Sequence, residues 1–259
     1  MKPVMQMELN FFKTTIHTGE NKEFLFPTLR ICQIVSGAFD WQIGKHTLRV
    51  SGGDIVLLNN LVPRKIVNAN ALPIELRVFE FPPAYIFDRR RLPEIFYSEE
   101  PVSVKANSRN QINSLLCVIA ESYGTMQDPG FFGHIFQAIF DLLEKDAGNE
   151  PVFGKYSSVV YQAVTFIWEH YREDIPVADV AGHLNVSKNH LEKVFGDLLG
   201  IGVAAYIRVI RVYKVMSLLK EDSERSVLDI AFSCGFNSSS GFYKAYKAVT
   251  GENPRRSGL

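Results

Sequence analysis

The chain has 259 residues and balances 28 Lys and Arg against 28 Asp and Glu, so its formal net charge is zero. Hydrophobic residues make up 46% and charged residues 22%, values typical of globular proteins that exclude a disordered or fibrous chain. At about 150 residues per domain, the length predicts one large domain or two ordinary ones. The zero net charge counts only partly against a nucleic-acid binder, because binding depends on where the charges lie.

Targeting signals and cysteine pairs are missing from the sequence. Residues 1–12 lack the apolar run of a secretory signal, and no stretch approaches 18 uninterrupted apolar residues. Cys32, Cys117 and Cys234 lie far apart without a Cys-x-x-Cys pair, which fits reduced thiols and neither a disulfide framework nor a thiolate metal cluster. The sequence therefore predicts a cytoplasmic protein without a membrane span.

Residues 9–105 show short alternating runs broken by Gly, Pro and Asn. The segment 39–60 is typical of three strands joined by a Gly-Lys turn and a Ser-Gly-Gly-Asp turn, and residues 74–81 alternate like another strand. Several short strands at this spacing predict a sandwich or small barrel. The arginine run at 89–91 is interpreted as a solvated loop face.

From about residue 108 onward, the apolar period becomes that of a helix. The segment 108–124 gathers its apolar residues on one face, whereas 131–145 is apolar almost all round. A helix of that second kind must be buried, against its own domain or another subunit. The stretch Ala-Gly-Asn-Glu-Pro at 147–151 is the best linker, so we predict domains at 1–150 and 151–259.

The C-terminal third contains one two-helix pattern twice. Residues 175–200 combine a short helix, a tight turn and a serine-capped second helix, which is the helix-turn-helix pattern. The pattern returns about 50 residues later, at 226–251. Two repeats at one spacing predict helix-turn-helix units at about 177–199 and 227–250, joined by an amphipathic helix at 203–220.

Three motifs in this region point to a known family. They are A-x-x-L-x-V-S-x-x-x-L-x-x-x-F at 181–195, Y-I-R-x-x-R at 206–211 and I-A-x-x-x-G-F-x-S-x-S-x-F-x-K-x-Y-K-x-x-T-G-x-x-P at 230–254. Together they resemble the AraC/XylS family of bacterial transcriptional regulators, over about residues 157–254. The resemblance implies two recognition helices that enter successive major grooves. Pro176, Gly241 and Ser257 depart from the family pattern, and Gly241 is expected to weaken its helix by about 1 kcal/mol.

The outward positions near the start of both predicted recognition helices carry polar side chains. Lys suits guanine acceptors, Asn suits adenine and Glu suits a cytosine amine. These positions match the base-reading positions of the family, which implies as DNA-binding residues Lys188, Asn189, Glu192, Lys193, Ser239, Ser240, Tyr243 and Lys244. A merely solvated helix face is the alternative interpretation. Arg211, on the joining helix, is either a phosphate contact or a pairing residue at the edge of the core.

The segment Ser-Gly-Gly-Asp-Ile-Val-Leu-Leu at 51–58 resembles the cupin-like barrel of many AraC-type regulators. The two resemblances imply an α+β, two-domain protein: an N-terminal cupin-like β-barrel with two dimerisation-type helices at about 108–146, then an all-α double helix-turn-helix domain. His17, His46 and His134 are not paired, so we predict no metal, no cofactor and no enzymatic activity. A barrel mouth can still bind a small-molecule effector, with candidate residues Phe26, Arg30, Trp41, Arg64 and Arg77.

The sequence thus predicts a sequence-specific DNA-binding transcriptional regulator, controlled by an effector and acting as a homodimer, with RNA polymerase as a further candidate partner. Two alternatives stay open: a cupin-type metalloenzyme with an appended helical domain, and a constitutive DNA binder whose barrel only dimerises. Residues 152–202 carry four basic and six acidic side chains, whereas 203–259 carry nine and five. We therefore expect the second unit to supply most of the attraction to phosphates.

Overall fold

The computed structural model describes residues 9–16, 27–59, 64–98, 101–104, 106–126, 128–147, 157–221 and 224–254. The chain divides into two compact units, one formed by Met1–Glu23 and Thr28–Ser157 and the other by Phe24–Pro27 and Ser158–Leu259. The predicted domain boundary at 150/151 lies outside the described residues. Among the helices described, none is long and apolar enough to cross a membrane.

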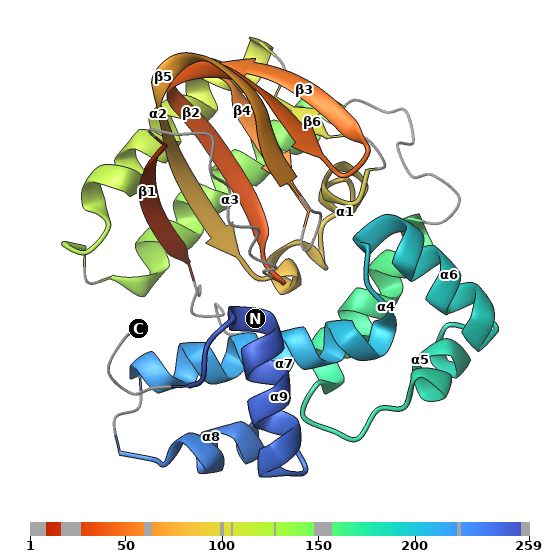
Figure 1. Cartoon of the computed structure of the whole chain (residues 1–259). Helices are drawn as coiled ribbons and strands as arrows, with labels where there is room; N and C mark the ends of the chain where they lie inside the picture. The colour runs from red at the N-terminus through yellow and green to blue at the C-terminus, as the bar shows by residue number, and fades with distance from the viewer. Residues whose placement is uncertain are drawn as a thin grey trace. The chain divides into compact units, whose positions relative to one another are not determined.

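A sheet of strongly bent strands forms the first unit (Figure 1). Its strands are β1 (Asn10–Ile16), β2 (Leu29–Ile43), β3 (His46–Ser51), β4 (Ile55–Leu58), β5 (Arg64–Phe81) and β6 (Val102–Ser103). The order is β1-β5-β2-β4-β6. Strand β3 also pairs with β2, along the later part of β2, whereas β4 pairs with its earlier part. All pairs are antiparallel, and the long β2–β5 ladder shifts register between Ile34 and Trp41, where the strands bend. Within the described strands the sheet stays open, with β1 and β6 at its edges.

The bend wraps the sheet around an apolar interior. Because side chains alternate between the two faces of a strand, every second residue of β2 and β5 points inward. The buried cluster consists of Cys32, Ile34, Phe39, Trp41, Ile43, Val50, Val56, Leu58, Ile66, Ile74, Leu76 and Val78. The predicted Gly44-Lys45 turn joins β2 to β3, and Gly44 adopts a φ of 57°, which glycine permits.

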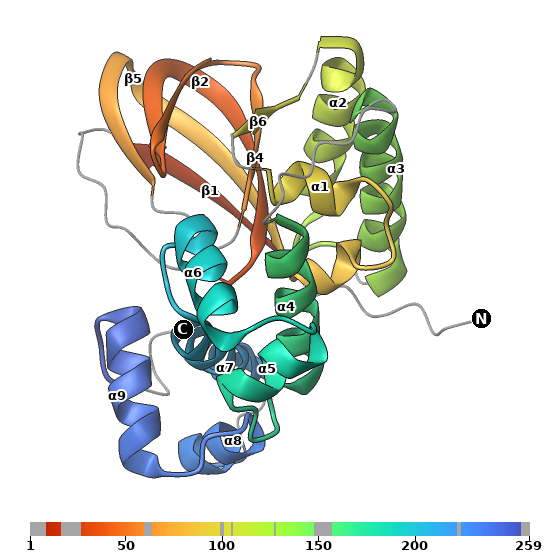
Figure 2. The same cartoon turned by 90° about the vertical axis from the view of Figure 1, so that its right-hand side faces the viewer.

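Helices cover the other face of the sheet (Figure 2). A short 3-10 turn η1 (Pro83–Ile86) and α1 (Leu92–Phe96) are followed by the long helices α2 (Ala106–Ser122) and α3 (Pro129–Ala147). The ring of Phe81 lies 5.6, 5.5 and 5.4 Å from the rings of Phe96, Phe136 and Phe140. This aromatic cluster joins β5 to α1 and α3 and closes the second core of the unit.

The interpretation of residues 89–91 as a solvated loop is wrong for two of the three arginines. The Arg89 guanidinium contacts Asp141, Glu144 and Gln137 of α3 and lies 5.7 Å from the Phe140 ring centroid. Arg91 pairs with Glu94 at 2.9 Å, and its side chain is only 11% exposed. For Arg89, acceptors about 50 residues away in sequence explain the difference, because a local charge run does not reveal them.

Helix α3 buries one face and leaves a second apolar face partly open. Phe136, Ile139, Phe140 and Leu143 are buried. Phe131, Ile135 and Leu142 recur at intervals of four and seven residues and are only half-buried. The expected burial on all sides is therefore not reached within this chain.

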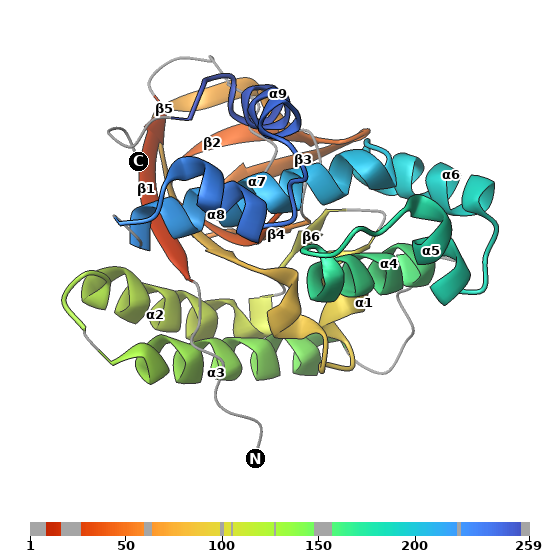
Figure 3. The ribbon, with the colours of Figure 1, turned by 90° about the horizontal axis from the view of Figure 1, so that it is seen from below.

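The second unit is helical throughout its described part. It contains α4 (Ser157–His170), α5 (Val177–His183), α6 (Lys188–Leu199), α7 (Val203–Glu221), α8 (Val227–Ser233) and α9 (Ser239–Thr250). Figure 3 shows the long helix α7 running between the α5–α6 pair and the α8–α9 pair. Tyr206 of α7 is fully buried, accepts a 3.0 Å hydrogen bond from Trp168 Nε1 and packs against the Phe195 ring. These contacts fix α4 and α6 on one end of α7.

Candidate DNA-binding interface

The first helix-turn-helix unit comprises α5 and α6. The turn between them places Asn185 at a φ of 54°, and the Val186 amide donates to the Ala181 carbonyl at 3.0 Å. Asn tolerates this left-handed conformation better than most residues. Ser187 then caps α6, because its Oγ accepts from the His190 amide at 3.2 Å. The predicted turn and cap of this unit are both present.

The second unit repeats the arrangement with α8 and α9. Ser226 Oγ accepts a hydrogen bond from the Asp229 amide at 3.0 Å, which caps α8. Gly235 takes the turn at a φ of 91°, and the Phe236 amide donates to the Ala231 carbonyl at 3.2 Å. Each of the two turns therefore contains an equivalent backbone hydrogen bond.

Helix α9 begins at a serine cap, and the capped amide belongs to a glycine. Ser238 Oγ accepts from the Gly241 amide at 3.2 Å, and a Cβ at residue 241 would lie 2.9 Å from that Oγ. Gly241 had been expected to weaken this helix through its low propensity. Gly241 lies in the first turn, directly beneath the cap, where an added Cβ would require the Ser238 side chain to shift.

Seven of the eight predicted DNA-binding side chains belong to exposed residues. They are Lys188, Asn189 and Lys193 on α6 and Ser239, Ser240, Tyr243 and Lys244 on α9. Tyr243 is 43% exposed although it is aromatic. On each helix these residues lie in the first half, beside a capped N-terminus whose free backbone amides attract anions.

Glu192 differs from this set because it is half-buried. Its Oε2 accepts a hydrogen bond of 3.2 Å from the Val203 amide, the first residue of α7. The fully outward placement expected from helical periodicity is therefore not observed. The partner is 11 residues further along the chain, beyond the turn that ends α6.

Arg211 has the structural role that the sequence left open. Its Nε donates to the Tyr171 carbonyl and its Nη2 to the Glu173 carbonyl, both at 2.7 Å. Burial lowers the pKa of the guanidinium, and the nearby Asp174 raises it. The same loop lies against the second turn, since a Cβ on Gly235 would meet the Tyr171 carbonyl oxygen at 2.7 Å. Arg211 thus fixes the α4–α5 loop, and sequence reasoning did not find the contact of Gly235 with this loop.

The predicted effector residues of the first unit lie in different surroundings. Arg30 is 6% exposed and forms an ion pair with Glu80 across the β2–β5 ladder. Trp41 belongs to the buried interior cluster, whereas Arg64, at the start of β5, is half-buried. Phe26 lies outside the described residues.

Arg77 lies in a polar group between the sheet and α2. Its Nη1 donates to Gln33 Oε1 at 3.3 Å and lies 3.1 Å from Cys117 Sγ. Gln33 Nε2 in turn donates to Asn113 Oδ1 at 2.8 Å. Because Asn113 and Cys117 belong to α2, Arg77 contacts the helix layer and is separated by the sheet from the interior cluster.

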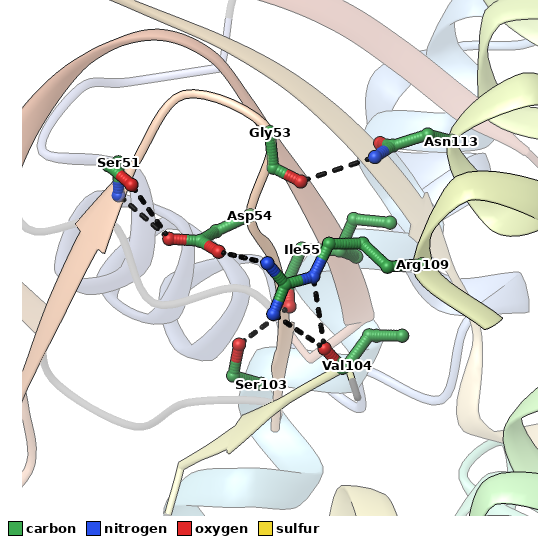
Figure 4. A network of polar contacts seen from close by, with 8 residues as sticks. All are labelled: Ser51, Gly53, Asp54, Ile55, Ser103, Val104, Arg109 and Asn113. Atoms are coloured by element: carbon green, nitrogen blue, oxygen red, sulfur yellow. Dashed lines mark hydrogen bonds and ion pairs between the residues drawn. The ribbon is translucent and has the colours of Figure 1, made fainter. Parts of the chain in front are cut away.

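The Ser-Gly-Gly-Asp turn at 51–54 is attached to α2 by a second polar network (Figure 4). Arg109 Nη1 pairs with Asp54 Oδ1 at 2.9 Å, and its Nη2 donates to the Val104 carbonyl at 3.2 Å. Asn113 Nδ2 donates to the Gly53 carbonyl at 3.2 Å. The segment that resembles a cupin motif is thereby attached to the helix layer through its turn. Within the described part of the chain, no three His, Cys, Asp or Glu side chains come together as a metal site.

Comparison with known proteins agrees with the geometry of the helical unit. The family model of the helix-turn-helix domain matches residues 180–257, which include the end of α5, α6, α7, α8 and α9. This match agrees with the resemblance to the AraC/XylS family that the sequence motifs indicate for this part of the chain. The matched segment contains both serine-capped helices, α6 and α9, and the helix α7 that joins them.

Two relatives share this domain to different extents. The melibiose operon regulatory protein of Escherichia coli K12 is 34% identical over 97 residues, which are 38% of this chain and 32% of the relative. The chain thus spans about a third of the length of that protein. The Msm operon regulatory protein of Streptococcus mutans is 25% identical over 274 aligned residues, covering 97% of this chain and 94% of the relative. The second similarity includes the strand-rich unit.

Solved structures of ToxT from Vibrio cholerae share the fold of both units. One, described as bound to an unsaturated fatty acid, has a TM-score of 0.58 at 16% identity and covers 95% of this chain and 92% of its own. Another has a TM-score of 0.59 at 18% identity. At these identities the similarity concerns the fold alone.

Proposed function

We propose that this protein is a DNA-binding transcriptional regulator that uses both helix-turn-helix units at once. The observation that carries the proposal is the pair of capped recognition helices, α6 and α9, held on one helix, α7. Equivalent lysines, Lys193 and Lys244, are exposed on the two helices. Two recognition helices held on one joining helix suit two successive stretches of major groove.

The distribution of charge supports the same function. The neutral total combines a net charge of −2 on residues 1–151 with +2 on 152–259. The excess of basic residues follows the start of α7, where nine basic residues meet five acidic ones. We expect the second unit to dominate phosphate attraction and the salt dependence of binding to be modest.

Selection of DNA fragments from a random pool, followed by fluorescence anisotropy on the selected site, tests this function. Lys193→Ala and Lys244→Ala should each weaken binding by about five- to a hundredfold, because a base contact contributes about 1–3 kcal/mol. Lys65→Ala, an exposed lysine of β5, is the matched control for loss of charge and should bind like the wild type. Recovery of no preferred sequence, or equal losses in all three variants, would contradict the proposal.

A small-molecule effector bound by the strand-rich unit is the second part of the proposal. Arg30 and Glu80 form a buried pair, so their charges balance. Near them along the strands, Thr28 Oγ1 and both amide atoms of Asn59 are buried without a hydrogen-bond partner. Ligand hydroxyls would satisfy these atoms, whereas a carboxylate would have to displace Glu80 from Arg30. We therefore expect a neutral polyhydroxylated effector in a cupin-like unit.

Thermal melting across a ligand panel tests the effector. The panel includes melibiose, because one relative is named for the melibiose operon, and unsaturated fatty acids, because one ToxT structure is described as holding one. A bound ligand should raise the melting temperature of the full chain. Asn59→Ala should abolish the shift for a sugar, and Asn68→Ala, an exposed asparagine of β5, should leave it intact. A response to fatty acids alone would contradict a neutral ligand.

One observation favours the second candidate function, a constitutive DNA binder whose first unit only dimerises. Twelve buried residues, Trp41 among them, fill the interior of the bent sheet. If no ligand of the panel shifts the melting temperature while DNA binding stays specific, this candidate replaces the effector-controlled one.

Dimerisation through α2 and α3 completes the proposal, with a cytoplasmic location and RNA polymerase as a further partner. The half-buried stripe Phe131, Ile135 and Leu142 on α3 supports a second copy of the chain as its cover, since apolar stripes of this kind are usually buried. Ile135→Glu should shift the protein to monomers in analytical ultracentrifugation. His134→Glu, at an exposed neighbour on the same helix, is the control.

A further inference from the structure

Glu192 of α6 reaches a helix other than its own. Its Oε2 accepts the Val203 amide at 3.2 Å, and Val203 is the first residue of α7. The amides in the first turn of a helix have no partner within the helix, and a carboxylate there is favoured by the helix dipole. Residue 202, which precedes α7, is a glycine without a capping side chain. Glu192 therefore supplies the cap that α7 lacks.

The approach of this carboxylate depends on Gly202. A Cβ built on Gly202 would lie 2.9 Å from Glu192 Oε2, closer than real Cβ contacts. A Cβ on Gly196, which is on α6 itself, or on Gly182 of α5 would meet nothing within 4 Å. Gly202 thus lies at the contact, whereas Gly196 and Gly182 lie in open space. Alanine substitutions at these positions can therefore disturb the contact or leave it unchanged.

The equivalent position of the second unit has no such contact. The repeat aligns Phe195 with Tyr246, and the same offset pairs Glu192 with Tyr243 and Lys193 with Lys244. Tyr243 is 43% exposed. The first unit therefore uses this helix position for a contact within the protein, whereas the second unit leaves it exposed.

We infer that Glu192 is a positioning residue for DNA recognition: it ties α6 to the start of α7 and so sets the orientation of the first recognition helix relative to the second. This inference rests on the proposed DNA-binding function. Because α7 also packs against α8 and α9, the angle between α6 and α7 determines how Lys188, Asn189 and Lys193 are placed when α9 occupies its own groove. Glu192 reads no base in this arrangement.

Four variants separate positioning from direct base reading. Glu192→Gln keeps an oxygen that accepts the Val203 amide, whereas Glu192→Ala removes it. Gly202→Ala crowds the carboxylate without altering Glu192, and its backbone is not among the positive-φ positions. Gly196→Ala is the matched control in open space. On the selected DNA site we expect Glu192→Ala and Gly202→Ala to weaken binding about tenfold, with Glu192→Gln and Gly196→Ala within about twofold of wild type.

The pattern over DNA sequences decides between the two roles. Positioning predicts that Glu192→Ala and Gly202→Ala reduce discrimination at every base pair read by α6 and broaden the tolerated spacing between the two half-sites. Direct reading predicts relaxed discrimination at one base pair, equally in Glu192→Gln and Glu192→Ala, with Gly202→Ala unchanged. That second pattern would overturn the inference.

A measurement without DNA keeps the inference testable if the proposed function fails. Spin labels at Asp197→Cys on α6 and Lys247→Cys on α9, in a Cys117→Ser background, report the distance between the two helices in the full chain; both labelled residues are exposed. We expect the distance distribution to broaden in Glu192→Ala and Gly202→Ala but not in Glu192→Gln or Gly196→Ala. Identical distributions in all four variants would overturn the positioning role, whatever the outcome of the DNA selection.

Discussion

The two helix-turn-helix units have the same backbone plan but different solutions at equivalent positions. Val186 and Phe236 donate to the carbonyls of Ala181 and Ala231, yet the residue before each is Asn185 in one unit and Gly235 in the other. Both turns need a positive φ, which Asn and Gly tolerate. Gly235 lies against the backbone of the α4–α5 loop, whereas Asn185 is exposed. The conformation is thus set by the turn, whereas the residue type is set by what packs on it.

The capping sites differ in the same way. Pro176 precedes α5 without a side-chain cap, whereas Ser226 caps α8 by accepting a hydrogen bond from the Asp229 amide. The recognition helices are alike, since Ser187 and Ser238 both accept an amide hydrogen bond three residues ahead. The second helices of the two units are thus more alike in their caps than the first helices.

Gly235→Ala should have the largest effect on stability. The φ of 91° and the approach to the Tyr171 carbonyl oxygen at 2.7 Å both oppose a Cβ, so we expect a loss of about 3 kcal/mol or more. Urea unfolding of the full chain, followed by circular dichroism, measures it. Gly251→Ala has a φ of 79° but open space and should lose only about 1 kcal/mol. Equal losses would show that the close packing of Gly235 contributes nothing.

Arg211→Ala should be the next largest. It leaves the Tyr171 and Glu173 carbonyls without their donors, and we expect a loss of about 2 kcal/mol in the free energy of unfolding. Arg208→Ala, at an exposed position of the same helix, should cost less than about 0.5 kcal/mol. If the two variants unfold alike, the loop does not depend on Arg211.

The caps of the two recognition helices predict matched losses. Ser187→Ala and Ser238→Ala should each lower the free energy of unfolding by about 1 kcal/mol. Thermal melting of both variants side by side makes the comparison direct. A loss in one variant only would break the equivalence of the two units.

The smallest effect is a dependence of stability on pH through the buried Cys234 thiol of the second unit. Burial raises the pKa of the Cys234 thiol above its ordinary value of 9.0, so the folded thiol stays protonated where the unfolded one ionises. Its contribution to stability is therefore complete below about pH 9 and is lost as the pH rises above that value. Iodoacetamide labelling of Cys234 in the full chain, read by mass spectrometry, should require opening of this unit. Rapid labelling of the folded protein would contradict its burial.

Cysteine 32 gives the matching probe in the strand-rich unit. Burial, opposed by Arg30 and aided by Glu80, raises the pKa of its thiol to about 12. We expect its labelling to follow opening of the first unit.

Much of the helical unit could be predicted from sequence because its signals are local. Capping serines, turn residues and apolar spacing lie within a few residues of the structure that they specify. The predicted units at about 177–199 and 227–250 agree with α5–α6 and α8–α9. The fates of Arg89, Glu192 and Arg211 could not be predicted, because their partners lie 11 to 55 residues away in sequence.

The strand-rich unit is harder to predict from sequence, because the partners of its strands and side chains also lie far away along the chain. The turns at 44–45 and 51–54 are local and were predicted. Closure of a barrel depends on which edges meet, and the described strands form an open sheet. Arg77 was expected at a ligand site, but strand alternation alone cannot tell which face of the sheet helices cover, and its contacts are with the helix layer.

The loop between α4 and α5 has a consequence for how this domain can change over time. Its carbonyls receive Arg211 from one side and pack against Gly235 from the other. A segment that precedes the first helix-turn-helix unit in the chain therefore supports the turn of the second. The two units are repeats, yet they are not interchangeable modules: a graft of the second unit from a relative would bring a turn fitted to a different loop. Recombination within this domain should succeed only where the α4–α5 loop, α7 and the second turn are inherited together.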